Sequence, residues 1–130
     1  DYPKAHSNLA NVLYDQGYVN QSFRHFEEAL KIDPDAVELH YNYGTALAER
    51  GRVKEAVDHY LKAIGLEPHL LQAHYNLGIL YAQQKKFKDA IGQFSEVLRI
   101  EPGHKSAQRN IIRVYQLMGE SSGSGAKSGQ

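Results

Sequence analysis

The chain has 130 residues, in which 15 Lys and Arg balance 15 Asp and Glu, and it contains no Cys. A formal net charge of zero argues against nucleic acid as a partner, and the absence of Cys excludes disulfides and thiolate zinc sites. No apolar run approaches the roughly 20 residues of a membrane-spanning helix and the start lacks the apolar stretch of a signal peptide, so we expect a cytoplasmic protein without membrane contact.

An internal repeat organises the chain. Pro34, Pro68 and Pro102 follow one another at intervals of 34 residues. Rows 3–36, 37–70 and 71–104 then agree in residue type at many columns. The agreeing columns hold His6, His40 and His74; Asn8, Asn42 and Asn76; Ala10, Gly44 and Gly78; Ser22, Ala56 and Ala90; Phe26, Tyr60 and Phe94; and Ala29, Ala63 and Val97.

Each row has the apolar spacing of two amphipathic helices. In the second row, Leu39, Tyr43 and Leu47 recur at every fourth position, and a second apolar stripe follows. Gly17 and Gly51 separate the two helices in the first two rows, because glycine takes the left-handed conformation that ends a helix. The third row has Lys85 there instead, which predicts either a strained left-handed Lys85 or another turn geometry.

Small side chains predict how the two helices of a row meet. Ala10, Gly44 and Gly78 on the first helices should face Ser22, Ala56 and Ala90 on the second helices, and the aromatic column should fill the flanking space. Two short helices cannot bury their apolar faces alone, so the rows must stack on one another.

The period of 34 and these columns resemble the tetratricopeptide repeat (TPR) family. The resemblance implies an all-α fold, a right-handed α-solenoid of three helix-turn-helix repeats plus a C-terminal capping helix. The usual Trp of the family is replaced by His6, His40 and His74. The wording of residues 5–11 is also similar to the superhelical repeats of O-linked N-acetylglucosamine transferase.

The two ends of the chain differ from the repeats. Asp1 and Tyr2 begin in the middle of the pattern, which indicates a piece of a longer array; the alternative is a natural start whose first residues extend the helix. Residues 105–118 repeat the first-helix pattern, but Ile112 replaces the small residue that a following helix would need, which favours a cap. We therefore expect a TPR domain at 1–118 and a flexible Gly/Ser-rich tail at 119–130.

The seven histidines do not predict a metal site. Residues in one column lie about 8–10 Å apart in stacked helices, too far to share an ion, and no two histidines are four residues apart. No nucleophile elbow, P-loop or dinucleotide fingerprint occurs. We therefore expect no metal, no cofactor and no catalytic residue, and hence a protein that is not an enzyme.

The concave face formed by the first helices is the candidate binding surface. Asn8, Asn42, Asn76 and Asn110 would form a ladder along it, and an Asn amide can both donate to and accept from a peptide backbone. The alternative is that these amides bond within the scaffold or to water. The predicted peptide-binding residues are Asn8, Asn11, Tyr14, Tyr41, Asn42, Thr45, Tyr75, Asn76, Ile79, Arg109, Asn110 and Arg113.

The resemblance also implies one particular ligand, because some members of the family grip the acidic C-terminal peptide of heat-shock chaperones with a two-carboxylate clamp. Asn11 and Asn42 match that clamp. Ser7, Gln72 and Asn76 stand where it needs three cations. We therefore do not expect chaperone tails as ligands.

The pattern as a whole predicts a non-enzymatic protein–protein interaction module that binds an extended peptide in the concave groove. A self-associating scaffold is one alternative, in which the exposed first row, with Tyr2, Leu9 and Leu13, stacks on another chain. A substrate-recruiting arm cut from a larger protein, such as a glycosyltransferase, is the other. Charge runs from an acidic first row to a basic end, where Arg109 and Arg113 would attract an acidic ligand; the alternative is a solvated face whose charges serve solubility alone.

Overall fold

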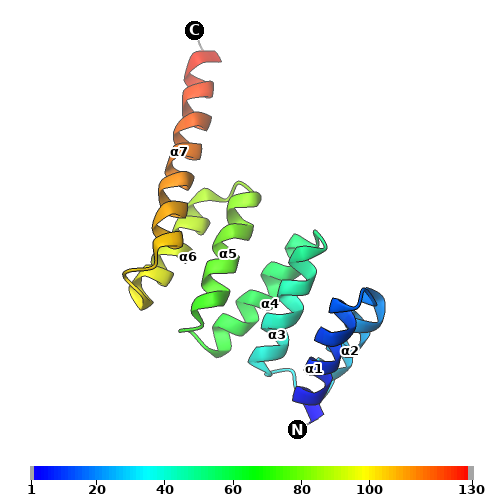
Figure 1. The fold of residues 1–130 in the computed structure, drawn as a ribbon. Helices are drawn as coiled ribbons and strands as arrows, with labels where there is room; N and C mark the ends of the chain where they lie inside the picture. Colours follow the sequence, from blue (N-terminus) through cyan, green and yellow to red (C-terminus); the bar gives the residue numbers. More distant parts are fainter. Residues whose placement is uncertain (1, 129–130) are drawn as a thin grey trace. The chain divides into compact units, whose positions relative to one another are not determined.

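The computed structural model describes residues 2–128 of the chain and the side chains of residues 4–122. This part of the chain contains helices and turns and no strand (Figure 1). The helices are α1 (Tyr2–Asp15), α2 (Val19–Ile32), α3 (Val37–Glu49), α4 (Val53–Leu66), α5 (Leu71–Gln83), α6 (Phe87–Ile100) and α7 (Lys105–Ser128). The prediction of an all-α fold with two helices in each row is confirmed.

The turn inside each row has the same backbone conformation despite different sequences. Gly17 and Gly51 adopt positive φ angles of 90° and 79°, and Lys85 adopts 60°. The Lys86 amide then donates to the Tyr81 carbonyl at 2.8 Å, as the Tyr18 amide does to Leu13. The third row therefore has the same left-handed turn, although a positive φ angle is strained for a lysine.

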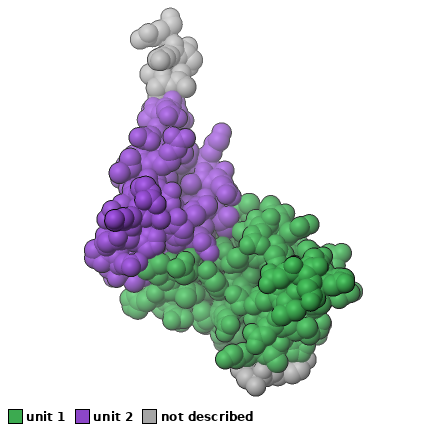
Figure 2. Space-filling view, in the orientation of Figure 1, with its two compact units in different colours: residues 1–73 green, residues 74–130 purple. Residues whose placement is uncertain are grey.

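The chain divides into two compact units, residues 1–73 and 74–130 (Figure 2). Unit 1 contains α1 to α4, with helix contacts within each hairpin and between α3 and both α1 and α2. Unit 2 contains α5 from His74 onward, α6 and α7. Each unit has its own buried apolar core, built around Phe26 and Tyr60 in unit 1 and around Phe94 in unit 2.

The hairpins of unit 1 close through the predicted small residues. The Ser22 hydroxyl on α2 donates to the Ala10 carbonyl on α1 at 2.7 Å. On α3, a Cβ atom added at Gly44 would stand only 3.1 Å from the Tyr60 ring on α4. The two helices of a hairpin can approach this closely because the side chain between them is small or absent.

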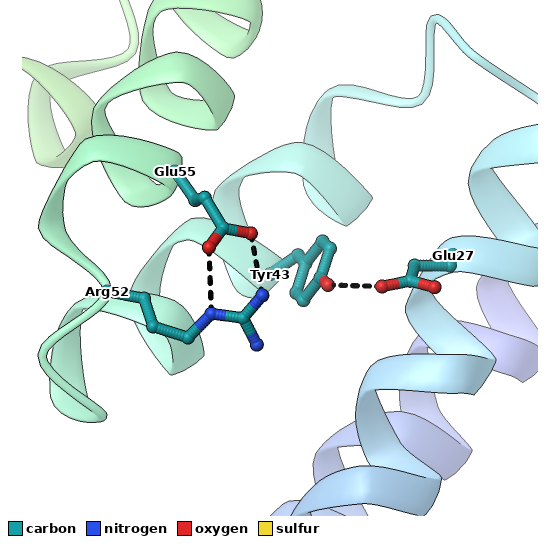
Figure 3. A network of polar contacts seen from close by, with 4 residues as sticks. All are labelled: Glu27, Tyr43, Arg52 and Glu55. Carbon is teal, nitrogen blue, oxygen red and sulfur yellow. Dashed lines mark hydrogen bonds and ion pairs between the residues drawn. The ribbon is translucent and has the colours of Figure 1, made fainter.

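A polar network at the junction of the two hairpins holds α3 against α2 (Figure 3). The Tyr43 hydroxyl on α3 donates to Glu27 on α2 at 2.8 Å, and the Tyr43 ring stacks on Phe26 at 5.1 Å. Burial and the hydrogen bond to Glu27 raise the pKa of Tyr43, so the phenol stays a donor. Arg52 pairs with Glu55 at 2.7 Å and covers the Phe23 ring, which closes the edge of this junction.

Unit 2 repeats the same hairpin geometry with less space. A Cβ atom added at Gly78 on α5 would lie 2.7 Å from the Phe94 ring on α6. Phe94 is 1% exposed, and α7 buries Ala107 and Val114 as it packs on α6. The Phe94 ring therefore fills the space that a side chain at position 78 would occupy.

The helix α7 extends ten residues beyond the boundary expected at Met118, up to Ser128. The flexible Gly/Ser-rich tail at 119–130 stays a prediction. Residues 129 and 130 of the predicted tail lie outside the described residues. Among the described helices, none combines the length and apolarity needed to cross a membrane.

We expect Gly78→Ala to destabilise the protein, because the new methyl group would push against the Phe94 ring. Overpacking a core typically costs about 1–3 kcal/mol, which exceeds the roughly 1 kcal/mol that alanine gains over glycine in a helix. Gly92→Ala on α6 is the matched control, since nothing lies within 4 Å of its added Cβ atom. Urea unfolding followed by circular dichroism should show Gly92→Ala as neutral or stabilising, and equal effects of the two changes would contradict this packing account.

Candidate functional site

A hollow between α1 and α3 in unit 1 has a volume of about 150 Å³. It lies on the helix face that the hairpin contacts leave uncovered. Its lining contains two asparagine amides, two tyrosine rings and two carboxylates. The lining residues are Asn11, Tyr14, Asp15, Tyr41, Asn42, Thr45, Ala46 and Glu49.

The aromatic and hydroxyl groups of this hollow are held by the scaffold beneath it. Thr45 Oγ1 lies 2.8 Å from the Tyr60 hydroxyl and donates to the Tyr41 carbonyl at 3.1 Å. The Tyr41 ring packs against the Tyr60 ring at 5.8 Å. The Tyr14 ring lies parallel to Phe23, at 6.4 Å. The surface that a ligand would meet is thus ordered before binding.

The Asn42 amide makes one hydrogen bond within unit 1. Its Nδ2 donates to the Oγ of Ser7, a buried residue on α1, at 3.1 Å. Its Oδ1 accepts no hydrogen bond within the part of the chain that the structure describes. An amide fixed in this way presents its carbonyl oxygen in a defined direction, while an N–H donor of a peptide could complete it.

The hollow in unit 1 is acidic. Asp15 and Glu49 line it, and no Lys or Arg is among the lining residues. Burial and the neighbouring Glu49 carboxylate raise the pKa of Tyr14 to about 12, so the phenol remains protonated at neutral pH, and it donates to the Ala46 carbonyl at 3.4 Å. The hollow therefore suits neutral or cationic groups.

Unit 2 contains a second hollow, of about 260 Å³, with a different lining. Aliphatic and aromatic side chains form most of it, and Arg113 supplies a positive charge. Asn110 is held there by a hydrogen bond from its Nδ2 to the Tyr75 hydroxyl at 3.1 Å. The lining residues are Ile79, Ala82, Gln83, Phe94, Asn110, Arg113, Val114 and Leu117.

The structure brings many of the predicted binding residues into these two hollows. The hollow in unit 1 contains Asn11, Tyr14, Tyr41, Asn42 and Thr45, and the hollow in unit 2 contains Ile79, Asn110 and Arg113.

Four predicted binding residues line neither hollow. Asn8 is exposed, Asn76 is half-buried, Tyr75 supports Asn110 from behind, and the Arg109 guanidinium donates to Ser106. Sequence reasoning left Asp15 and Glu49 out of the site, although their columns lie on the same helix face.

Two pairs of histidines form contacts that spacing along the sequence does not indicate. The Nδ1 atoms of His40 and His59 are 3.0 Å apart, and those of His6 and His25 are 3.3 Å apart. Each pair joins the two helices of one hairpin and is 19 residues apart in the sequence. The absence of a metal site was predicted from histidines in one column or on one helix, which does not cover such pairs. No group of three or more His, Cys, Asp or Glu in the described residues is placed to hold a metal ion.

The surroundings of His40 and His59 bear on where each ring carries its protons. His40 Nε2 lies 2.6 Å from the Pro34 carbonyl, which can only accept, so Nε2 carries a proton. In the tautomer with Nε2 protonated and Nδ1 free, the His40 Nδ1 accepts from the Nδ1–H of His59. Burial and the His40 ring lower the pKa of His59, against the opposing effect of Asp58, Glu55 and Glu27.

Comparison with protein families places the chain among repeat proteins built from helical hairpins. A family described as TPR repeat matches residues 10–49 and 44–85, and the family described as tetratricopeptide repeat matches residues 71–104. The chain therefore belongs to the tetratricopeptide repeat family, as the repeat columns predicted. The finer resemblance to O-linked N-acetylglucosamine transferase stays a prediction.

Several solved structures have the same fold. A crystal structure of MamA is 24% identical with a TM-score of 0.84, and the two cover 90% of this chain and 68% of that one. The first TPR of Spaghetti (RPAP3), bound to the HSP90 peptide SRMEEVD, is 18% identical with a TM-score of 0.84, covering 91% and 94%. The Arabidopsis OM64 TPR domain is 20% identical with a TM-score of 0.80, covering 88% and 95%.

The chain spans 64% of a second MamA crystal structure, so it corresponds to part of that protein. A comparison with curated protein sequences gave no match. These likenesses confirm the predicted fold class, the all-α TPR solenoid, and at this level of identity they show the fold alone.

The histidine pair predicts that acid destabilises unit 1. The unfolded chain protonates His59 near the ordinary pKa of about 6.5, whereas the folded chain does so only at lower pH. The free energy of unfolding should therefore fall as the pH drops below about 6.5. His59→Gln should reduce this fall, because the third row already pairs His74 with Gln93 at 2.7 Å.

Urea unfolding at pH 7.5 and pH 5.5, followed by circular dichroism, measures this effect. His69→Gln, at an exposed position, is the control for loss of one histidine. If both variants lose as much stability in acid as the original chain, the histidine pair is not the cause.

Proposed function

We propose that this chain is a non-enzymatic protein-interaction module that binds an extended peptide segment of its partner. The observation that carries the proposal is the hollow in unit 1, where five predicted binding residues meet. Its asparagine and tyrosine side chains are ordered by contacts to buried neighbours, so little conformational entropy is lost when a ligand binds.

Membership of the tetratricopeptide repeat family supports this role. The RPAP3 repeat of the same fold was solved with a bound peptide, which indicates that the fold can hold a peptide. The hollow of this chain is small and open, a form that suits one or two peptide residues rather than a deeply enclosed cofactor.

In the proposed complex, Asn11 and Asn42 pair with the backbone of the ligand. The Asn42 Oδ1 would accept a peptide N–H, while its Nδ2 stays on Ser7. Each such bond contributes about 1 kcal/mol and is independent of the ligand's side chains. Asn8, Asn76 and Asn110 complete the proposed ladder.

The walls of each hollow would select the side chain of the residue that binds there. In unit 1, Tyr14 and Tyr41 offer flat rings with polar tips, which suit both apolar and hydrogen-bonding side chains. In unit 2, the apolar walls around Ile79 would take an aliphatic side chain, with Arg113 at the rim beside it. In the proposal, Tyr75 and Arg109 contribute to ligand binding in unit 2, and Tyr75 does so through its hydrogen bond with Asn110.

The charge of the unit 1 hollow argues against an acidic chaperone tail as its ligand. Asp15 and Glu49 would repel the carboxylates of such a peptide. Ser7, at one of the cation positions of the family clamp, is buried and bonded to Asn42. We therefore propose a neutral or basic segment for this hollow.

Asn42→Ala should weaken peptide binding about fivefold, because it removes the proposed backbone acceptor, worth about 1 kcal/mol. The probe is a tight-binding peptide selected on the immobilised protein from a phage-displayed random library, and the measurement is isothermal titration calorimetry. Ser7→Ala is the matched control, since it deletes the same internal hydrogen bond but keeps the Asn42 amide.

Ser7→Ala should keep most of the affinity, whereas equal losses in both variants would assign the effect to scaffold stability. Failure of the library to yield any peptide that competes at this surface would overturn the proposal. The peptide SRMEEVD, added as a separate probe, should bind weakly or not at all, and tight binding of it would refute the charge argument.

A further inference from the structure

The hollow in unit 1 lies at the C-terminal ends of the two helices that bound it. Asp15 is the last residue of α1, Glu49 is the last residue of α3, and both carboxylates line the hollow. The carbonyl groups at the C-terminus of a helix carry a partial negative charge. The negative potential of this hollow therefore comes from two carboxylates and from two helix ends.

A carboxylate at the C-terminal end of a helix lowers the stability of that helix, because like charges meet there. Neither α1 nor α3 has a basic residue in its last turn that would offset this effect. Neither Asp15 nor Glu49 forms an ion pair within the described part of the chain. The third row has the neutral Gln83 at the equivalent position. Residues that break a local stability rule in this way are expected at functional sites.

One cation of unit 1 lies close to this hollow. Arg50 follows Glu49 in the chain, and it lowers the pKa of Tyr14, although burial and Glu49 raise that pKa by more. Arg50 is exposed and does not line the hollow. The groups that a ligand would meet inside the hollow therefore keep two negative charges.

Two tyrosine rings form a further part of the wall. The Tyr14 ring lies parallel to Phe23, and the Tyr41 ring packs against Tyr60, so neighbours within unit 1 hold both rings. Aromatic rings attract cations, and the planar guanidinium of an arginine stacks on them more readily than the ammonium of a lysine. A guanidinium can also donate to two carboxylates at once, because its five N–H groups point along different edges.

We infer that the hollow in unit 1 binds an arginine side chain of the partner's segment, with its guanidinium between the carboxylates of Asp15 and Glu49 and beside the two tyrosine rings. The inference rests on the proposed function and adds the residue that this hollow selects. A volume of about 150 Å³ suits one such side chain. Asn42, in the same hollow, would hold the backbone next to that arginine.

Peptides selected from the phage-displayed random library test this inference. The peptides whose binding is weakened by Asn42→Ala should share an arginine at one position. Replacement of that arginine by citrulline, which has nearly the same shape but no charge, should lower the affinity about fivefold in isothermal titration calorimetry. Replacement by lysine should give a smaller loss, since lysine keeps the charge but not the planar group.

Two variants of the protein test whether this arginine lies in the hollow. Asp15→Asn and Glu49→Gln should each weaken the arginine peptide about threefold and leave the citrulline peptide nearly unchanged, because only the charged peptide loses a partner. Glu49→Gln introduces the residue type that the third row has at Gln83. Glu67→Gln, at an exposed position outside the hollow, is the control for loss of one negative charge and should change neither affinity. Circular dichroism checks that every variant is folded.

Peptides that compete at this hollow without a shared arginine overturn the inference and leave the peptide-binding role intact. The same holds if citrulline or lysine binds as tightly as arginine. Equal weakening of the arginine and citrulline peptides by Glu49→Gln also overturns it, because that result assigns the effect to the scaffold. A library that yields no peptide for this surface overturns the proposed function and this inference together, so the two failures are distinguishable.

Discussion

The close approach of the two helices in each hairpin is the constraint on which this structure depends. Ala10, Gly44 and Gly78 remove the side chain at the crossing point, and a large aromatic ring from the second helix fills the space beside it. Because the ring and the gap must match, this column fixes both the distance and the register of the helices. The same crossing contact also sets which face of each first helix stays uncovered.

The candidate binding surface is a by-product of that packing. Residues of the first helices that do not contact a second helix are left to line the hollows, and their neighbours in the core hold them in place. Thr45 touches the core residue Tyr60, and Asn42 is bonded to the buried Ser7. The polar groups that would meet a partner are thus supported by the same residues that stabilise the fold, so their geometry is ordered before any ligand arrives.

The repeats share one backbone geometry but differ in chemistry at equivalent positions. His40 meets His59 in the second row, whereas His74 meets Gln93 in the third. The hollow in unit 1 carries two carboxylates, and the hollow in unit 2 is mostly apolar with one arginine. Ile112 stands in α7 where α3 and α5 have glycine, and Ile112 and Tyr115 are both exposed. Differences of this kind allow similar hairpins to recognise different groups.

Residue spacing alone predicts the repeat, the helix pairs, the small-residue crossings and the helix face on which Asn11, Tyr41 and Asn42 lie, because helical periodicity and a period of 34 can be read directly from it. The packing of the helices was needed to reveal the bond of Asn42 to Ser7, the contact of His40 with His59 and the contrast between exposed Val12 and buried Ala46. These features join residues of separate helices, and their outcome depends on distances and coverage of about one side chain. Spacing along a single helix contains no information about what lies across from it.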